Sequence, residues 1–217
     1  MSSPQPSIAR RLQSMVERGL LEPDEAARLQ GATVGLAPAG ATWANPFVRF
    51  GGEKAATMGV LIALLSAFVS RGGLRYDGAF DTHKAKQAVS WGTALFDQIL
   101  ALPLSALVFW LVASVLGSKG RYIDQFGAVG LSRLPYLLMG ALLLQLQVGD
   151  LSNGHLSPAV AAVVLTSLFA LTWNFVWLFR GFKNASGLLG AKLVRGFIVS
   201  IVLAETLSKI ALTLVRP

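Results

Sequence analysis

The chain has 217 residues, of which 53% are hydrophobic and 14% are charged. An ordinary soluble domain carries roughly 25% charged residues, so this composition favours a protein that is embedded in a lipid bilayer. The net charge is +8, but the Lys and Arg residues lie between apolar runs rather than on one polar domain, so we predict no nucleic-acid partner. Cysteine is absent, which excludes disulfides, thiolate metal sites and cysteine nucleophiles.

The N-terminal part of the chain is expected to form a small helical hairpin on the cytoplasmic side. Its first helix is indicated by apolar residues at helical spacing: Ile8, Leu12, Met15 and Val16. Gly19 ends this helix, and Pro23 can open a second one. The next stretch is rich in Gly, Ala and Pro and has no charge, as is typical of a flexible linker. We therefore predict a hairpin at 1–30, a linker at 31–46 and a membrane domain at 47–217.

Five apolar segments follow the linker, at residues 55–70, 93–116, 134–148, 157–179 and 196–215. A helix needs about 20 apolar residues to cross the hydrocarbon core. The third segment is short and could instead be a re-entrant or interfacial helix, although Ser132 and Arg133 can extend it toward the headgroups. We therefore predict an all-α integral membrane bundle of five transmembrane helices.

The distribution of Lys and Arg near the ends of these segments predicts the orientation of the protein in a cell (inner) membrane. One face receives nine basic residues: Arg49, Lys54, Lys119, Arg121, Arg133, Arg180, Lys183, Lys192 and Arg195. The other face receives five: Arg71, Arg75, Lys84, Lys86 and Arg216. Because cytoplasmic loops carry the excess of basic residues, we expect the N-terminus and residues 117–133 to be cytoplasmic. Residues 71–87 and the C-terminus would then lie outside.

The polar connection after the first segment contains a candidate metal site. Asp77, Asp81 and His83 supply two carboxylates and an imidazole within seven residues, a donor set that suits several divalent metals. In the alternative interpretation, Asp77 and Gly78 form a turn, and Asp81 balances the neighbouring lysines. The sequence leaves both interpretations open.

The fifth segment carries the only acid and base that lie together inside an apolar run. Glu205 and Lys209 are four residues apart, with the acid N-terminal to the base, so we predict an intramembrane pair. A stripe of small residues at intervals of four predicts close helix packing: Gly196, Ser200, Ala204 and Ser208. The pair could form an ion or proton path, or it could be structural with Lys209 reaching toward the headgroups.

Two connections share a pattern of small, basic and apolar residues: GSKGRYIDQFGAVGLSRLPYLL at 117–138 and WLFRGFKNASGLLGAKLVRG at 177–196. In the first, a small-residue and basic turn leads through an amphipathic stretch to a proline that opens the third span, with Gly120, Phe126, Gly130 and Pro135 as the matching residues. In the second, the matching residues are Gly181, Phe182, Lys183, Gly187, Leu188, Ala191 and Leu193. From Pro46 to Val215 the chain resembles the Yip family of five-span membrane proteins, named for members that interact with Ypt/Rab GTPases.

The resemblance is to the prokaryotic branch of that family, because the acidic, Tyr-containing motif of the eukaryotic trafficking members is not present before the first span. For this branch, the resemblance implies a multi-pass membrane protein sometimes suspected of accompanying ABC-type transporters.

These observations predict a non-enzymatic membrane component that organises or accompanies another membrane complex, with no catalytic residue and no cofactor. Its partner would be a membrane protein or a second copy of the chain. The sequence has no phosphate-binding loop, and nothing around its serines favours a nucleophile. Two alternatives remain: a transporter or channel component with an ion or proton path at Glu205 and Lys209, and a membrane-embedded hydrolase using Asp77, Asp81 and His83.

Overall fold

The computed structural model describes residues 8–24, 26, 45–76, 78–85, 88–145 and 158–215. The chain divides into two compact units, Met1–Trp43 and Ala44–Pro217.

The first unit contains α1 (Ile8–Glu17), which is the first helix of the predicted hairpin. Gly19 follows it with a φ of 65° and donates its N–H to the Val16 carbonyl. Most of the predicted second helix and most of the linker at 31–46 fall outside the described residues, so the hairpin and the linker stay predictions.

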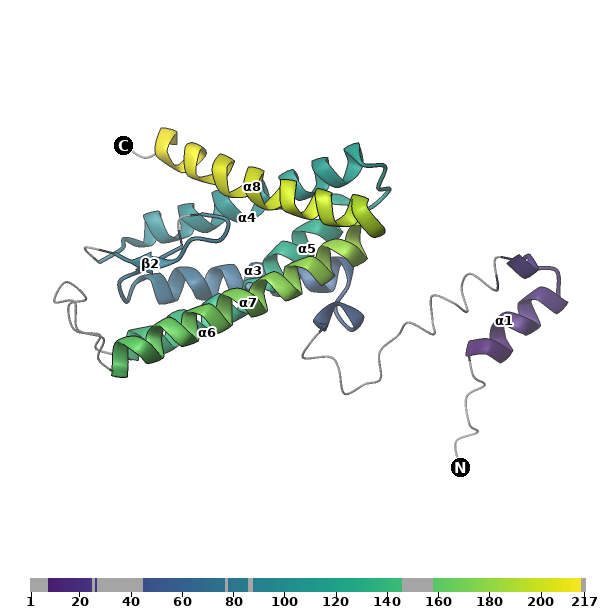
Figure 1. Ribbon diagram of the computed structural model, residues 1–217, viewed down its shortest axis with the longest axis horizontal. Helices are drawn as coiled ribbons and strands as arrows, with labels where there is room; N and C mark the ends of the chain where they lie inside the picture. The colour runs from purple at the N-terminus through teal and green to yellow at the C-terminus, as the bar shows by residue number, and fades with distance from the viewer. Residues whose placement is uncertain are drawn as a thin grey trace, which may run out of the picture. The chain divides into compact units, whose positions relative to one another are not determined.

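Among its described residues, the second unit contains five helical segments that are long and apolar enough to cross a membrane (Figure 1). After a short 3-10 helix, η2 (Pro46–Val48), they are α3 (Gly52–Ser70), α4 (Trp91–Val115), the pair α5 (Tyr122–Ser132) and α6 (Leu134–Gln145), α7 (Pro158–Ser186) and α8 (Gly190–Val215). The predicted number of apolar helical segments is therefore confirmed, and the segments are compatible with a multi-pass membrane protein.

The start of the third segment was predicted wrongly, and its predicted end at 148 lies outside the described residues. The sequence indicated a short span at 134–148 that follows a cytoplasmic connection, whereas the apolar segment of the structure runs from Tyr122 to Leu144. It consists of α5 and α6 together. The predicted connection at 117–133 is therefore mostly helix and belongs to the bundle.

Small residues explain why α5 did not stand out as apolar. Close backbone packing in lipid depends on such residues, although they add little to hydropathy. A Cβ atom built on Gly130 would lie 2.6 Å from the Cα atom of Gly59, and one built on Gly127 would lie 2.7 Å from the Cβ atom of Ala55. These contacts bring α5 against α3, the most extensive helix pair of the unit.

The α5–α6 segment is interrupted at Arg133. Pro135 has no N–H to continue the helical hydrogen bonding, and its ring disfavours a continuous helix through this position. At the interruption, the Asn174 side chain of α7 donates a hydrogen bond of 2.7 Å to the Ser132 carbonyl. The neighbouring helix thus supplies a polar partner where the backbone leaves its regular pattern.

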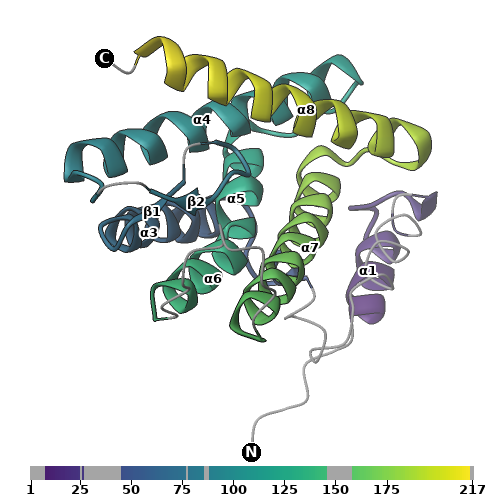
Figure 2. The ribbon, with the colours of Figure 1, turned by 60° about the vertical axis from the view of Figure 1, so that its left-hand side comes forward.

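Helix α8 lies along α4, as Figures 1 and 2 show. The small-residue stripe of α8 is buried at all four of its positions: Gly196, Ser200, Ala204 and Ser208. A Cβ atom built on Gly196 would lie 2.6 Å from Cδ1 of Leu116, at the end of α4. The stripe therefore faces protein.

The connection between α3 and α4, residues 71–90, folds inward. It contains a two-residue antiparallel ladder between β1 (Leu74–Arg75) and β2 (His83–Lys84). Several of its apolar side chains are buried: Leu74, Tyr76, Ala79 and Val89. The sequence indicated a polar loop here. The structure instead places part of this connection against the helices, where side chains of the helices form hydrogen bonds with its backbone.

Candidate functional site

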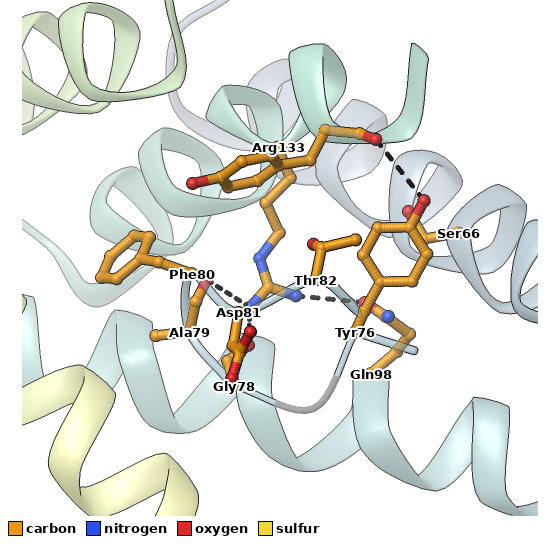
Figure 3. Close-up of a pocket in the computed structure, with 10 residues that line it drawn as sticks. Ser66, Tyr76, Gly78, Ala79, Phe80, Asp81, Thr82, Gln98 and Arg133 are labelled. Atoms are coloured by element: carbon orange, nitrogen blue, oxygen red, sulfur yellow. Dashed lines mark hydrogen bonds between the residues drawn. The ribbon is translucent and has the colours of Figure 1, made fainter. Parts of the chain in front are cut away.

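Arg133 is the centre of a polar cluster inside the bundle. Its side chain is only 6% exposed and extends from the α5–α6 interruption toward the α3–α4 connection (Figure 3). Its Nη1 donates to Oε1 of Gln98 at 3.1 Å, and its Nη2 donates to the carbonyls of Gly78 and Ala79 at 3.2 and 3.1 Å. The prediction that Arg133 reaches the headgroups at the cytoplasmic face is therefore wrong, because its guanidinium binds backbone carbonyls within the protein.

The same stretch of backbone is bound from the other side by α8. The N–H of Phe80 donates to Oε2 of Glu205 at 3.0 Å, and the N–H of Ala79 donates to Oγ of Ser208, also at 3.0 Å. The Ala79–Phe80 peptide thus has its carbonyl on Arg133 and its N–H on Glu205. Its dipole points its negative end at the cation and its positive end at the anion, the favourable orientation in a low-dielectric interior.

Lys209 and Glu205, the predicted pair, lie together. Nζ of Lys209 is 3.0 Å from Oε1 of Glu205 and also 3.0 Å from Oδ2 of Asp81 on the connection. The Lys209 side chain is 52% exposed, so this ion pair lies at the edge of the protein rather than deep in the bundle. Sequence spacing along α8 identified two members of this triad, but no local signal pointed to Asp81 as the third.

A second ion pair ties the connection to α4. Asp97 is 2% exposed, and its Oδ2 accepts a hydrogen bond of 3.3 Å from Nε of Arg75. Together with Arg133, Glu205 and Lys209, Asp97 completes a common pattern. These four charged side chains come from three helical segments, and each bonds to a residue of the α3–α4 connection.

The predicted metal site stays a prediction, because one of its three residues is not among those that the structure describes. Asp77 lies outside the described residues, and Nδ1 of His83 is 3.8 Å from Oδ1 of Asp81. Among the described residues there is no group of three His, Cys, Asp or Glu side chains that could hold a metal ion. Because the ammonium of Lys209 already contacts Asp81, one oxygen of this carboxylate is engaged by a cation of the protein itself.

A small pocket lies under the connection, and we call it the Arg133 pocket. Its lining includes Ser66 of α3, Tyr76 and residues 78–82 of the connection, Gln98 of α4, and Arg133 and Tyr136 of the α5–α6 segment. Its free space admits about one water molecule. Burial raises the pKa of Tyr76 above its ordinary value, so the hydroxyl stays protonated and donates a long hydrogen bond of 3.5 Å to the Tyr136 carbonyl.

Comparison of the chain with protein-family models, curated proteins and solved structures finds no match. The role of the cluster must therefore be inferred from its geometry. The resemblance to the Yip family stays a prediction. Among the described residues, the cluster brings charged side chains to backbone groups and to each other. Such an arrangement can hold a segment of chain in place and can neutralise charge inside an apolar bundle.

Exchanging Glu205 for Gln should destabilise the protein more than exchanging Lys209 for Met. Glu205→Gln weakens the hydrogen bond to Phe80 and removes the charge that Lys209 pairs with, and we expect a loss of about 1–2 kcal/mol. Lys209→Met leaves the hydrogen bond from Phe80 to Glu205 in place. Since the Lys209 side chain is half exposed and its pairs lie at the edge of the protein, that loss should be smaller, at about 1 kcal/mol or less. Reversible unfolding of both variants in detergent measures the difference, and the opposite order would contradict this assignment of roles.

Proposed function

We propose that this protein is a non-enzymatic, multi-pass membrane component that organises or accompanies another membrane complex. Its resemblance to the prokaryotic branch of the Yip family makes an ABC-type transporter a candidate partner. The observation that carries the proposal is that the charged side chains inside the helical segments bond to one connecting segment of the same chain. Asp97, Arg133, Glu205 and Lys209 all bond to the α3–α4 connection, so their charges hold this connection in place against the helices.

This use of charge supports a binding role. A segment whose backbone is held from both sides keeps a defined shape, and a defined surface lowers the entropic cost of binding a partner. The first unit, Met1–Trp43, offers a second contact region that is compact by itself. Its helix α1 has basic residues at Arg10 and Arg11, which favour acidic protein or anionic lipid.

A transporter or channel component with an ion or proton path at Glu205 and Lys209 is the second candidate. Charged side chains within a membrane bundle favour it, since such groups mark many ion pathways. Against it, Glu205 and Lys209 bond to each other and to the connection, and the Arg133 pocket admits only about one water molecule. Ion or proton flux into proteoliposomes that contain the purified chain alone would favour this second candidate.

The proposed orientation in a cell membrane can be tested with single cysteines, because the chain has none of its own. Lys119 lies between α4 and α5 and Leu189 lies between α7 and α8, so both should be cytoplasmic. Ala88, in the α3–α4 connection, should face outward. All three positions are exposed. We expect an impermeant thiol reagent to label only position 88 in intact cells and all three after lysis, and the reverse pattern would invert the topology.

The accessory role predicts a stoichiometric partner that depends on the N-terminal arm. We expect the full chain, purified in a mild detergent, to retain another integral membrane protein such as an ABC-type permease. Deleting residues 1–35 should remove that partner while insertion and the unfolding midpoint stay unchanged, because the first unit is compact by itself. Mass spectrometry of both preparations identifies the partner. A truncated chain that no longer folds would show that the arm belongs to the bundle, and a full chain that is always isolated alone would contradict the accessory role.

A further inference from the structure

One end of the second unit carries many exposed cations. The η2–α3, α4–α5 and α7–α8 connections lie at this end (Figure 1). Oγ of Ser118 donates to the carbonyl of Ser186 at 2.6 Å, and a Cβ atom built on Gly52 would lie 3.1 Å from Nη2 of Arg121. Seven exposed basic residues belong to these connections or to the adjoining helix turns: Arg49, Lys54, Lys119, Arg121, Lys183, Lys192 and Arg195.

Most of these cations have no charged partner among the described residues. The described acids of this end are Glu53 and Asp124, and Asp124 pairs with Arg121 at 3.0 Å. The other six cations form no ion pair with a described acid. At the opposite end, by contrast, Arg75 and Lys209 pair with carboxylates of the protein. Exposed cations that gather with few acids create a positive potential, which attracts an anionic partner.

Two of the cations, Lys192 and Arg195, begin an exposed face of α8 that continues into apolar residues. Lys192, Arg195, Val199 and Leu203 are three or four residues apart, so they lie on one side of the helix, and we call them the outer α8 face. All four side chains are exposed, Val199 by 46% and Leu203 by 41%. The face extends about 16 Å along the helix axis, roughly the depth of one hydrocarbon leaflet. In a membrane, its cations would lie at the headgroups and its apolar side chains below them.

From this arrangement we infer that the outer α8 face binds an anionic phospholipid. The phosphate would contact Lys192 and Arg195, and an acyl chain would pack along Val199 and Leu203. A phospholipid offers both a negative headgroup and an apolar chain, whereas a free phosphate or an acidic soluble protein would engage only the cations. The inference rests on the proposed insertion of the chain in a membrane, and it does not depend on the accessory role.

The first test is thermal unfolding of the purified full chain in mixed micelles that contain either phosphatidylglycerol or the same amount of phosphatidylcholine. A ligand that binds only the folded protein raises the unfolding midpoint, and we expect a midpoint about 3 °C higher in phosphatidylglycerol. High salt should reduce the difference, because it screens the headgroup charge. Equal midpoints in the two lipids would overturn the inference. A rise of the same size with inorganic phosphate alone would also overturn it, since the acyl chain would then contribute nothing.

The double variant Lys192→Gln with Arg195→Gln locates the effect. Both side chains are exposed and form no ion pair with a described acid, so the variant should fold and keep its midpoint in phosphatidylcholine. It should lose most of the rise in phosphatidylglycerol. The matched control is Arg49→Gln with Lys54→Gln, which removes two exposed charges from the same end but outside α8, and it should keep most of the rise. Equal losses in the two double variants would mean a diffuse attraction by the whole end and would overturn the assignment to α8.

Native mass spectrometry tests the same face by counting bound lipids. We expect at least one phosphatidylglycerol to stay on the native chain and on the control, and to be lost from the Lys192→Gln, Arg195→Gln chain. Leu203→Ser keeps both cations and should lower the apparent affinity several-fold, because it shortens the apolar contact. Unchanged affinity in Leu203→Ser, or an acidic protein retained in place of the lipid, would contradict lipid binding along this face. All these measurements use the purified chain without a partner, so they can fail while the accessory role stands, and the reverse.

Discussion

Replacing Arg133 with Met should release the α3–α4 connection from the bundle and destabilise the protein by about 3 kcal/mol or more. The substitution keeps much of the apolar stem but removes all donors of the guanidinium. The carbonyls of Gly78 and Ala79 and the amide oxygen of Gln98 then lose their partner together. On the other side of the same backbone, the bond from Phe80 to Glu205 remains, but it holds the segment from one side only.

A cysteine at Ser66 reports whether the connection has moved. Ser66 is buried, lines the Arg133 pocket and bonds only within its own helix, so Ser66→Cys is a mild change. We expect a thiol reagent to react slowly with Ser66→Cys alone and at least tenfold faster when Arg133→Met is added. Arg121→Met is the matched control, since Arg121 is exposed and bonds within one turn of its own helix. Equal protection in the Arg133→Met background would show that the guanidinium does not hold the connection.

The apolar helical segments were predictable from sequence because hydropathy reports transfer to lipid residue by residue. The long apolar runs of α4 and α7 needed no tertiary information. The spacing of Ser200, Ala204 and Ser208 also placed the packed face of α8 correctly, since residues four apart share one side of a helix. In these cases the residues that define the local sequence pattern are also the residues that the tertiary structure buries or places in the apolar helices.

The Arg133 pocket was not predictable in the same way. Arg133 was assigned to the cytoplasmic face because a basic residue beside an apolar run is usually a surface residue. Two of its three partners are backbone carbonyls more than fifty positions earlier in the chain, and backbone groups have no sequence signature. Moving Arg133 into the interior leaves eight basic residues against five at the two faces, so the predicted orientation keeps its basis.

The largest loss of stability is expected from Gly130→Val, because it disturbs backbone rather than side chains. A Cβ atom at position 130 would lie 2.6 Å from Cα of Gly59, and the backbone of α3 cannot rotate away as a side chain can. The helices α3 and α5 would have to separate, and their contact is the most extensive between helices in this unit. Overpacking typically costs about 1–3 kcal/mol, and a contact between two backbones belongs at or above the upper end of that range.

Unfolding in mixed micelles gives the size of this effect, and gel filtration gives the folded fraction. Gly92→Ala is the matched control, because Gly92 lies in the first turn of α4 and an added Cβ atom would meet only Oγ of Ser90, at 3.9 Å. That variant should remain within about 0.5 kcal/mol of the native chain, since Ala is the better helix former and nothing must move. If Gly130→Val were as stable as Gly92→Ala, α3 and α5 could not be in backbone contact. Because Arg133 is three residues beyond Gly130, separation of these helices should also displace the guanidinium and expose a cysteine placed at Ser66.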